Sequence, residues 1–96
     1  MKSISEIKKL LQENKTDLMM RYNLRSIAIF GSITRNEATE KSDIDILVDF
    51  EKPIGLEFVL LADELEEILG VKVDLVTPKA LKPKMLEYIK QDLQYV

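Results

Sequence analysis

Three short apolar segments constrain the fold of this chain more than any other feature. Residues 24–30, 44–51 and 71–76 are rich in isoleucine, valine and leucine, and their length suits strands better than helices. Segments with helical periodicity lie before, between and after them. In 96 residues this order predicts one domain, residues 1–96, of the α+β class, with helices packed against a small mixed sheet.

Capping and helix-breaking residues place the helices. The sequence predicts four of them: over residues 3–22, over residues 32–39, along the apolar stripe that ends at Gly70, and over residues 82–92. Ser3 and Glu6 form a capping-box pattern at the first of these. The tail, residues 93–96, is expected to add a short strand.

Composition excludes several classes of protein. The net charge of −3 argues against a general nucleic-acid binder, since no broad basic surface is available to release counterions. Cysteine is absent, which excludes disulfides and thiolate metal sites, and histidine is absent, which excludes an imidazole base. The chain has neither the apolar core of a signal peptide nor an apolar run of about 20 residues, so the expected location is the cytoplasm.

A glycine–serine pair follows the first predicted strand. Gly31 lets the backbone approach a ligand closely, and Ser32 is expected to cap the short helix, whose amides would favour an anion. Arg35 lies one helical turn further, on the same side. An ordinary strand-to-helix turn would show the same pair, so the feature predicts a phosphate site only in combination with others.

Two aspartates open the second predicted strand. Asp43 and Asp45 are spaced i, i+2 and therefore project from one face, about 6–7 Å apart, where their carboxylates can share hard cations such as Mg²⁺. Two such ions would stabilise the attacking and leaving oxygens of a phosphoryl displacement. A solvated strand face with alternating acids is the alternative.

A third acid, Asp74, lies between Val73 and Leu75 in the third predicted strand. Its apolar neighbours predict a buried carboxylate, which needs a cation partner or a raised pKa. In a metal site it could accept the proton of an incoming hydroxyl. The alternative is an exposed position on an edge strand.

These features also constrain the sheet. One triphosphate can reach both the turn at Gly31 and Ser32 and the acids at Asp43 and Asp45 only if the end of the first strand lies beside the start of the second. An antiparallel pair satisfies this condition, and Asp74 must then come from a strand next to the second. The prediction is a mixed sheet, not a doubly wound parallel one.

The motif resembles the nucleotidyltransferase fold of the DNA polymerase beta superfamily, and most closely the minimal nucleotidyltransferases encoded with HEPN toxins. The residues that carry the resemblance are Gly31, Ser32, Arg35, the run Ser42-Asp43-Ile44-Asp45, and Asp74 within Val73-Asp74-Leu75-Val76. One departure is Asn36, where the family often has glycine; asparagine tolerates the left-handed conformation that such a turn needs.

The resemblance implies a Mg²⁺-dependent enzyme, with two ions, that transfers AMP from ATP to a hydroxyl of a cognate HEPN ribonuclease toxin. The acceptor would be a tyrosine, and the transfer would make the protein the toxin's antitoxin. It implies that Asp43, Asp45 and Asp74 are the catalytic and metal-binding residues. It likewise implies that the nucleotide is bound by Gly31, Ser32, Arg35 and Ser42.

The size of the chain supports a protein acceptor independently, because 96 residues leave no room for a separate acceptor domain. A hetero-oligomer with the toxin is therefore expected, without direct binding of nucleic acid or membrane. The alternative is a non-enzymatic antitoxin that neutralises the toxin by binding alone.

Overall fold

The computed structural model describes residues 2–96 as alternating helices and strands around one sheet. The elements are α1 (Ile4–Tyr22), β1 (Leu24–Phe30), the 3-10 helix η1 (Ser32–Arg35), β2 (Ile44–Phe50), α2 (Leu56–Leu69), β3 (Val73–Val76), the 3-10 helix η2 (Pro78–Ala80), α3 (Pro83–Lys90) and β4 (Gln94–Tyr95). Within these described residues, no helix is both long and apolar enough to cross a bilayer.

The sheet is mixed, in the order β3-β2-β1-β4. β1 pairs antiparallel with β2 and with β4, whereas β2 and β3 run parallel. The predicted antiparallel pair and the predicted position of the third strand beside the second are confirmed. The short tail strand is also confirmed, since Gln94 and Tyr95 pair with β1.

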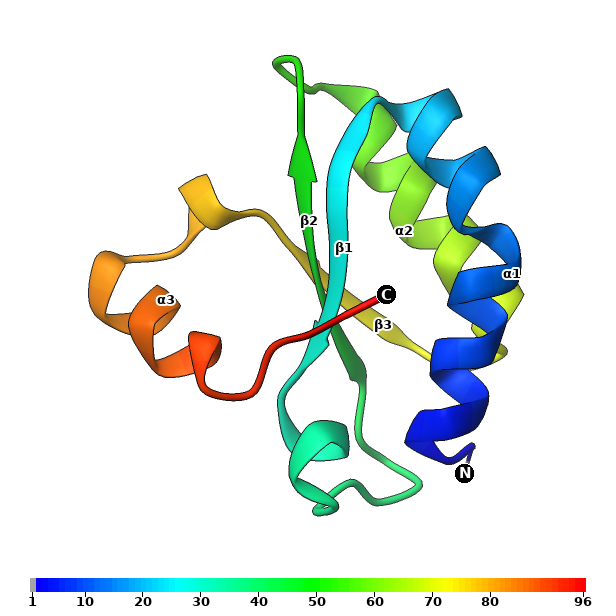
Figure 1. The fold of residues 1–96 in the computed structure, drawn as a ribbon, viewed down its shortest axis with the longest axis vertical. Helices are drawn as coiled ribbons and strands as arrows, with labels where there is room; N and C mark the ends of the chain where they lie inside the picture. Colours follow the sequence, from blue (N-terminus) through cyan, green and yellow to red (C-terminus); the bar gives the residue numbers. More distant parts are fainter. Residues whose placement is uncertain (1) are drawn as a thin grey trace.

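The main core lies between the sheet and the pair of helices α1 and α2, which Figure 1 shows together on one side of the strands. The predicted capping box begins α1: the Glu6 amide donates to the Ser3 hydroxyl, and the Ser3 amide donates to the Glu6 carboxylate. The fully buried side chains come from both helices and from the strands: Ile7, Leu11, Leu18, Ile27, Ile29, Ile44, Ile46, Val48, Leu61, Leu65 and Leu69.

A smaller cluster covers the other side of the sheet, where α3 lies (Figure 1). Phe30 of β1, Leu47 of β2 and Ile89 of α3 form its buried centre. Since strand side chains alternate, Asp45 is directed to this side together with Leu47. α3 is only eight residues long and leaves part of this face open, so the half-buried Asp45 stays within reach of solvent.

The helix expected over residues 32–39 is wrong in type and length. The structure has a single 3-10 turn, η1, that ends where Asn36 adopts a left-handed conformation with φ of 58°. The N-cap position is Gly31, not Ser32 as predicted. β-branched residues favour helix weakly, and the Thr34 hydroxyl donates to the Gly31 carbonyl (2.7 Å), which stabilises the short turn instead.

Candidate nucleotidyl-transfer site

The turn after β1 is built against a carboxylate of β2. Gly31 is buried and has φ of +84°, a conformation that side chains rarely adopt. A Cβ atom on this residue would lie 2.0 Å from Oδ2 of Asp45. The register explains the proximity, because Phe30 is paired with Asp45. Gly31 is therefore required by the backbone angle and by the space that Asp45 fills, and the predicted turn and the predicted acid lie in direct contact.

Asp45 and Asp74 face each other across two neighbouring strands, since they are partners in the parallel register of β2 and β3. Asp43 precedes Asp45 by two residues and is exposed, directly before β2. The prediction that Asp74 is buried is wrong: its side chain is exposed, because β3 is the edge of the sheet and α3 does not cover this position. Its apolar neighbours instead alternate toward the α1–α2 core.

The ionised form of Asp45 is disfavoured in the folded protein. Burial, followed by the charge of Asp74, a hydrogen bond with Asp74 and the charge of Asp43, raises the pKa of this carboxyl to about 6, against the opposing charge of Arg35. A divalent cation would relieve this repulsion, and carboxylate oxygens are the ligands that Mg²⁺ prefers. The carboxylate oxygens of Asp43, Asp45 and Asp74 are therefore suitable ligands for such an ion. Across residues 2–96, however, no three acidic side chains are already gathered in the arrangement of a preformed metal site.

The raised pKa has a measurable consequence for stability. Because the folded pKa lies above the unfolded value of about 3.8, ionised Asp45 disfavours the folded state; the penalty is absent below pH 3.8 and complete above pH 6. We expect Asp45→Asn to raise the free energy of unfolding by about 1–2 kcal/mol at pH 7.5, allowing for solvent screening, and to have no such effect near pH 3.5. Thermal unfolding across this pH range measures the difference. An equal gain at both pH values would contradict the assignment.

Arg35 lies at the end of η1 and is held by two carboxylates. Its Nε donates to Oε1 of Glu37 at 2.7 Å, and its Nη1 donates to Asp92. The positive charge of Arg35 also lowers the pKa of Asp45, so the guanidinium acts on the acidic side of the site. The sequence indicated Arg35 but gave no sign of Asp92, which is 57 residues away in the chain.

The two serines differ in their surroundings. Ser32 is the first residue of η1, next to the glycine that touches Asp45. Ser42 instead closes the turn before β2, where its hydroxyl accepts the amide hydrogen of Thr39 at 2.9 Å. Thr34, which the sequence analysis missed, bonds to the Gly31 carbonyl through its hydroxyl and its amide. A threonine three residues after a glycine turn is a local signal that could have indicated this role.

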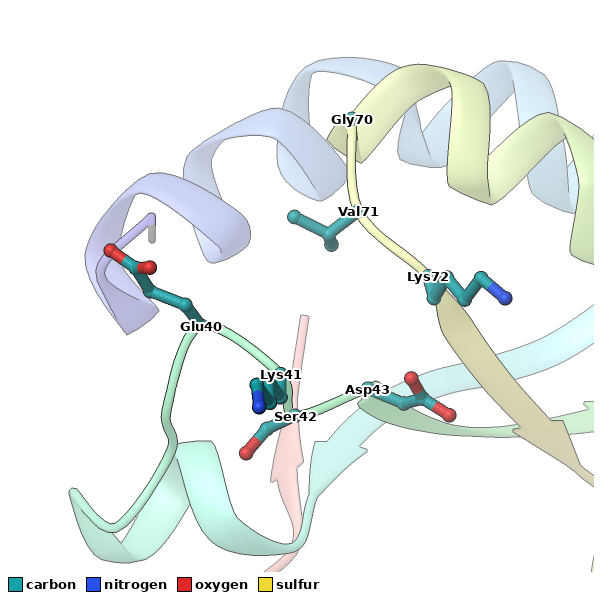
Figure 2. A pocket seen from close by; sticks show the side chains of 7 residues that line it. All are labelled: Glu40, Lys41, Ser42, Asp43, Gly70, Val71 and Lys72. Carbon is teal, nitrogen blue, oxygen red and sulfur yellow. The ribbon is translucent and has the colours of Figure 1, made fainter.

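A hollow of about 660 Å³ opens beside the first acid. It is lined by residues 40–43, which precede β2, and residues 70–72, which precede β3 (Figure 2). Lys41 and Lys72 are among its exposed lining residues. The acidic site is therefore bordered by open, partly basic surface where a larger molecule can approach.

The glycine turn contacts Asp45, which faces Asp74 in a mixed sheet, and this is the arrangement that the sequence predicted for nucleotidyl transfer. The chain belongs to the nucleotidyltransferase domain family, whose model matches residues 4–96. A relative from Methanocaldococcus jannaschii, provisionally named a protein adenylyltransferase, is 55% identical over 98 residues that cover 100% of both chains. Protein adenylyltransferase MntA of Thermococcus cleftensis is 42% identical over 97 residues, covering 100% of this chain and 98% of that one.

Solved structures show the same fold. A minimal nucleotidyltransferase, also provisionally named, matches with a TM-score of 0.78 at 32% identity and covers 94% of this chain and 95% of that chain. A complex of a tri-AMPylated Shewanella oneidensis HEPN toxin with an MNT antitoxin matches with a TM-score of 0.66, covering 91% of this chain and 69% of that chain. At 22% identity this second likeness concerns the fold alone. The predicted minimal nucleotidyltransferase fold is confirmed.

Proposed function

We propose that this protein is an antitoxin that transfers AMP from ATP to a tyrosine hydroxyl of a HEPN-family toxin, with Mg²⁺ as cofactor. The observation that carries the proposal is the contact between the Gly31 turn and Asp45, with Asp74 opposite Asp45 in the register. This arrangement supports binding of a phosphate chain and of cations at one place.

The residues take distinct roles in this proposal. Asp43 and Asp45 would hold the divalent cations, with Asp74 completing the set, and a cation bound there would offset the charge that develops on the phosphate oxygens. Ser32, Arg35 and the backbone at Gly31 bind the triphosphate, and Ser42 fixes the turn that presents Asp43.

ATP, the acceptor hydroxyl and Asp74 account for every bond and proton in the proposed reaction. The acceptor oxygen forms a bond to the α-phosphorus of ATP, the bond from that phosphorus to the β-phosphate oxygen breaks, and pyrophosphate leaves. Asp74 accepts the proton of the acceptor hydroxyl, a role that suits its exposed position at the edge of the sheet. An exposed base is accessible to a hydroxyl delivered by another protein.

The related proteins support a protein as the acceptor of the AMP group. The names of the two relatives describe protein adenylyltransferases, and the HEPN toxin in the solved complex carries AMP groups next to an antitoxin of this fold. The open surface beside Asp43 supplies room for a protein acceptor to reach the acids.

Transfer of radiolabel from [α-³²P]ATP to a purified HEPN-family toxin tests the proposal. We expect label on that protein in the presence of Mg²⁺, lost on chelation, and located on tyrosine by peptide mass spectrometry. Toxin neutralisation without any label would favour the alternative antitoxin that acts by binding alone. Label from [γ-³²P]ATP instead of [α-³²P]ATP would contradict nucleotidyl transfer.

A further inference from the structure

The contact between Arg35 and Asp92 joins two distant parts of the chain. Arg35 ends η1, directly after the glycine turn, whereas Asp92 lies between α3 and β4. The Asp92 side chain is only 17% exposed, compared with 62% for Glu37, the other carboxylate on the same guanidinium. A partly buried ion pair is screened less by solvent, so Asp92 is the stronger constraint on the orientation of Arg35.

The backbone around Asp92 is itself fixed on both sides. Its amide donates to the carbonyl of Ile89 at 2.8 Å at the end of α3, and two residues later Gln94 pairs with Ile29 of β1. The Gln94 side chain also accepts a hydrogen bond from Lys8 of α1 at 3.0 Å. Both ends of the Arg35–Asp92 pair are therefore anchored to β1, the strand that leads into Gly31.

The pair leaves donors on the guanidinium for a ligand. An arginine side chain carries five N–H donors, and here Nε donates to Glu37 while Nη1 donates to Asp92. Nη2 and the second hydrogen of Nη1 remain to bind a phosphate oxygen. Carboxylates bound at Nε and Nη1 restrain the plane of the guanidinium, and its Nη2 group stays available to a ligand.

We propose that Asp92 is a positioning residue for the nucleotide: it holds the Arg35 guanidinium in the orientation that binds the triphosphate, and it thereby makes the segment after α3 part of the active site. The inference rests on the proposed nucleotide binding at Gly31, Ser32 and Arg35. Asp92 acts only through Arg35 and touches no reacting atom.

A double-mutant cycle tests this role on the full chain. The probe is AMP-PNP with Mg²⁺, and binding is measured by chemical-shift titration, which resolves dissociation constants into the millimolar range. We expect Asp92→Asn to weaken binding about 5–10-fold, a loss typical of one charge-assisted hydrogen bond. The matched control Glu37→Gln removes the more exposed carboxylate from the same guanidinium and should change binding less than about 2-fold.

The double-mutant cycle distinguishes a role of Asp92 in orienting Arg35 from a general effect of Asp92 on the structure. In an Arg35→Ala background, Asp92→Asn should weaken binding no further, since the residue it acts on is absent. In the transfer assay, Asp92→Asn should raise KM for ATP with kcat changed less than about 2-fold.

Three results would overturn the inference: tighter nucleotide binding by Asp92→Asn, an equal loss in both backgrounds, or an effect no larger than that of Glu37→Gln. If the unmodified protein itself fails to bind AMP-PNP with Mg²⁺, the proposed function fails. If it binds and Asp92→Asn binds equally well, the positioning role alone fails.

Discussion

Replacing Asp43 and Asp45 together by asparagine is expected to reduce AMP transfer by at least about 1,000-fold while leaving the protein folded. Asparagine keeps the size and shape of both side chains but removes the charges that would hold the cations and oppose the charge of the triphosphate. The rate of label transfer from [α-³²P]ATP to the proposed HEPN acceptor measures the loss, and circular dichroism verifies the fold.

The matched control for this pair is Asp49→Asn. Asp49 belongs to the same strand and the same alternating set as Asp45, but it lies near the other end of β2, where its carboxylate is 3.8 Å from Arg25. We expect its transfer rate to stay within about 2-fold of the unmodified protein, since exposed ion pairs of this kind contribute little. Equal rates for the double variant and the unmodified protein would exclude Asp43 and Asp45 from catalysis.

The same substitutions should show that the ionised acids of the site lower the free energy of unfolding. Because ionised Asp45 disfavours folding, its removal is expected to stabilise the free protein at neutral pH while it abolishes transfer. A variant that is more stable and inactive would distinguish a functional cluster of acids from a structural one. Structural carboxylates would show the opposite change, a loss of stability on neutralisation.

Gly31→Ala is expected to have the second-largest effect. Alanine would have to adopt φ near +84°, and its Cβ would lie 2.0 Å from Oδ2 of Asp45, so the turn or the carboxylate must move. We expect a loss of roughly 2 kcal/mol or more in the free energy of unfolding and of at least about 100-fold in kcat/KM for ATP. Chemical denaturation and the transfer assay measure the two losses.

Gly55→Ala serves as the control for this substitution. Gly55 precedes α2, and a Cβ there would meet only Oε2 of Glu57, at an ordinary 3.8 Å. Because this contact is ordinary and involves none of the three acids, transfer should stay close to that of the unmodified chain. A Gly31→Ala protein that behaves like Gly55→Ala would show that the turn is not confined by Asp45.

Local patterns were sufficient for most helices and strands and for their order. β1 was predicted with the bounds observed, because a run of apolar residues follows Asn23, which ends α1 in a left-handed conformation. The pairing of β1 with β2 followed from the requirement that one ligand reach both Gly31 and Asp45, and the register confirms it. The i, i+2 spacing placed Asp45 on one face, as observed.

Long-range contacts could not be read from local patterns. Burial of Asp74 was inferred from Val73 and Leu75, but exposure depends on strand order and on where α3 lies, and neither is encoded within that segment. The helix after Gly31 was overextended because the left-handed conformation that Asn36 tolerates was not taken as the end of the helix. The partnership of Arg35 and Asp92 depends on the return of the chain to β1 through β4, which no periodicity indicates.

The central claim is that Asp43, Asp45 and Asp74 form one cation-binding site beside the Gly31 turn. Paramagnetic broadening by Mn²⁺, added below one equivalent in the presence of AMP-PNP, tests it most directly in the amide spectrum of the protein. We predict that the amides of Gly31, Asp45 and Asp74 are lost first and that those of the acidic outer face of α2 persist. Broadening that begins on α2, around Asp63 and Glu67, with the Gly31 and Asp45 signals intact, would contradict the account.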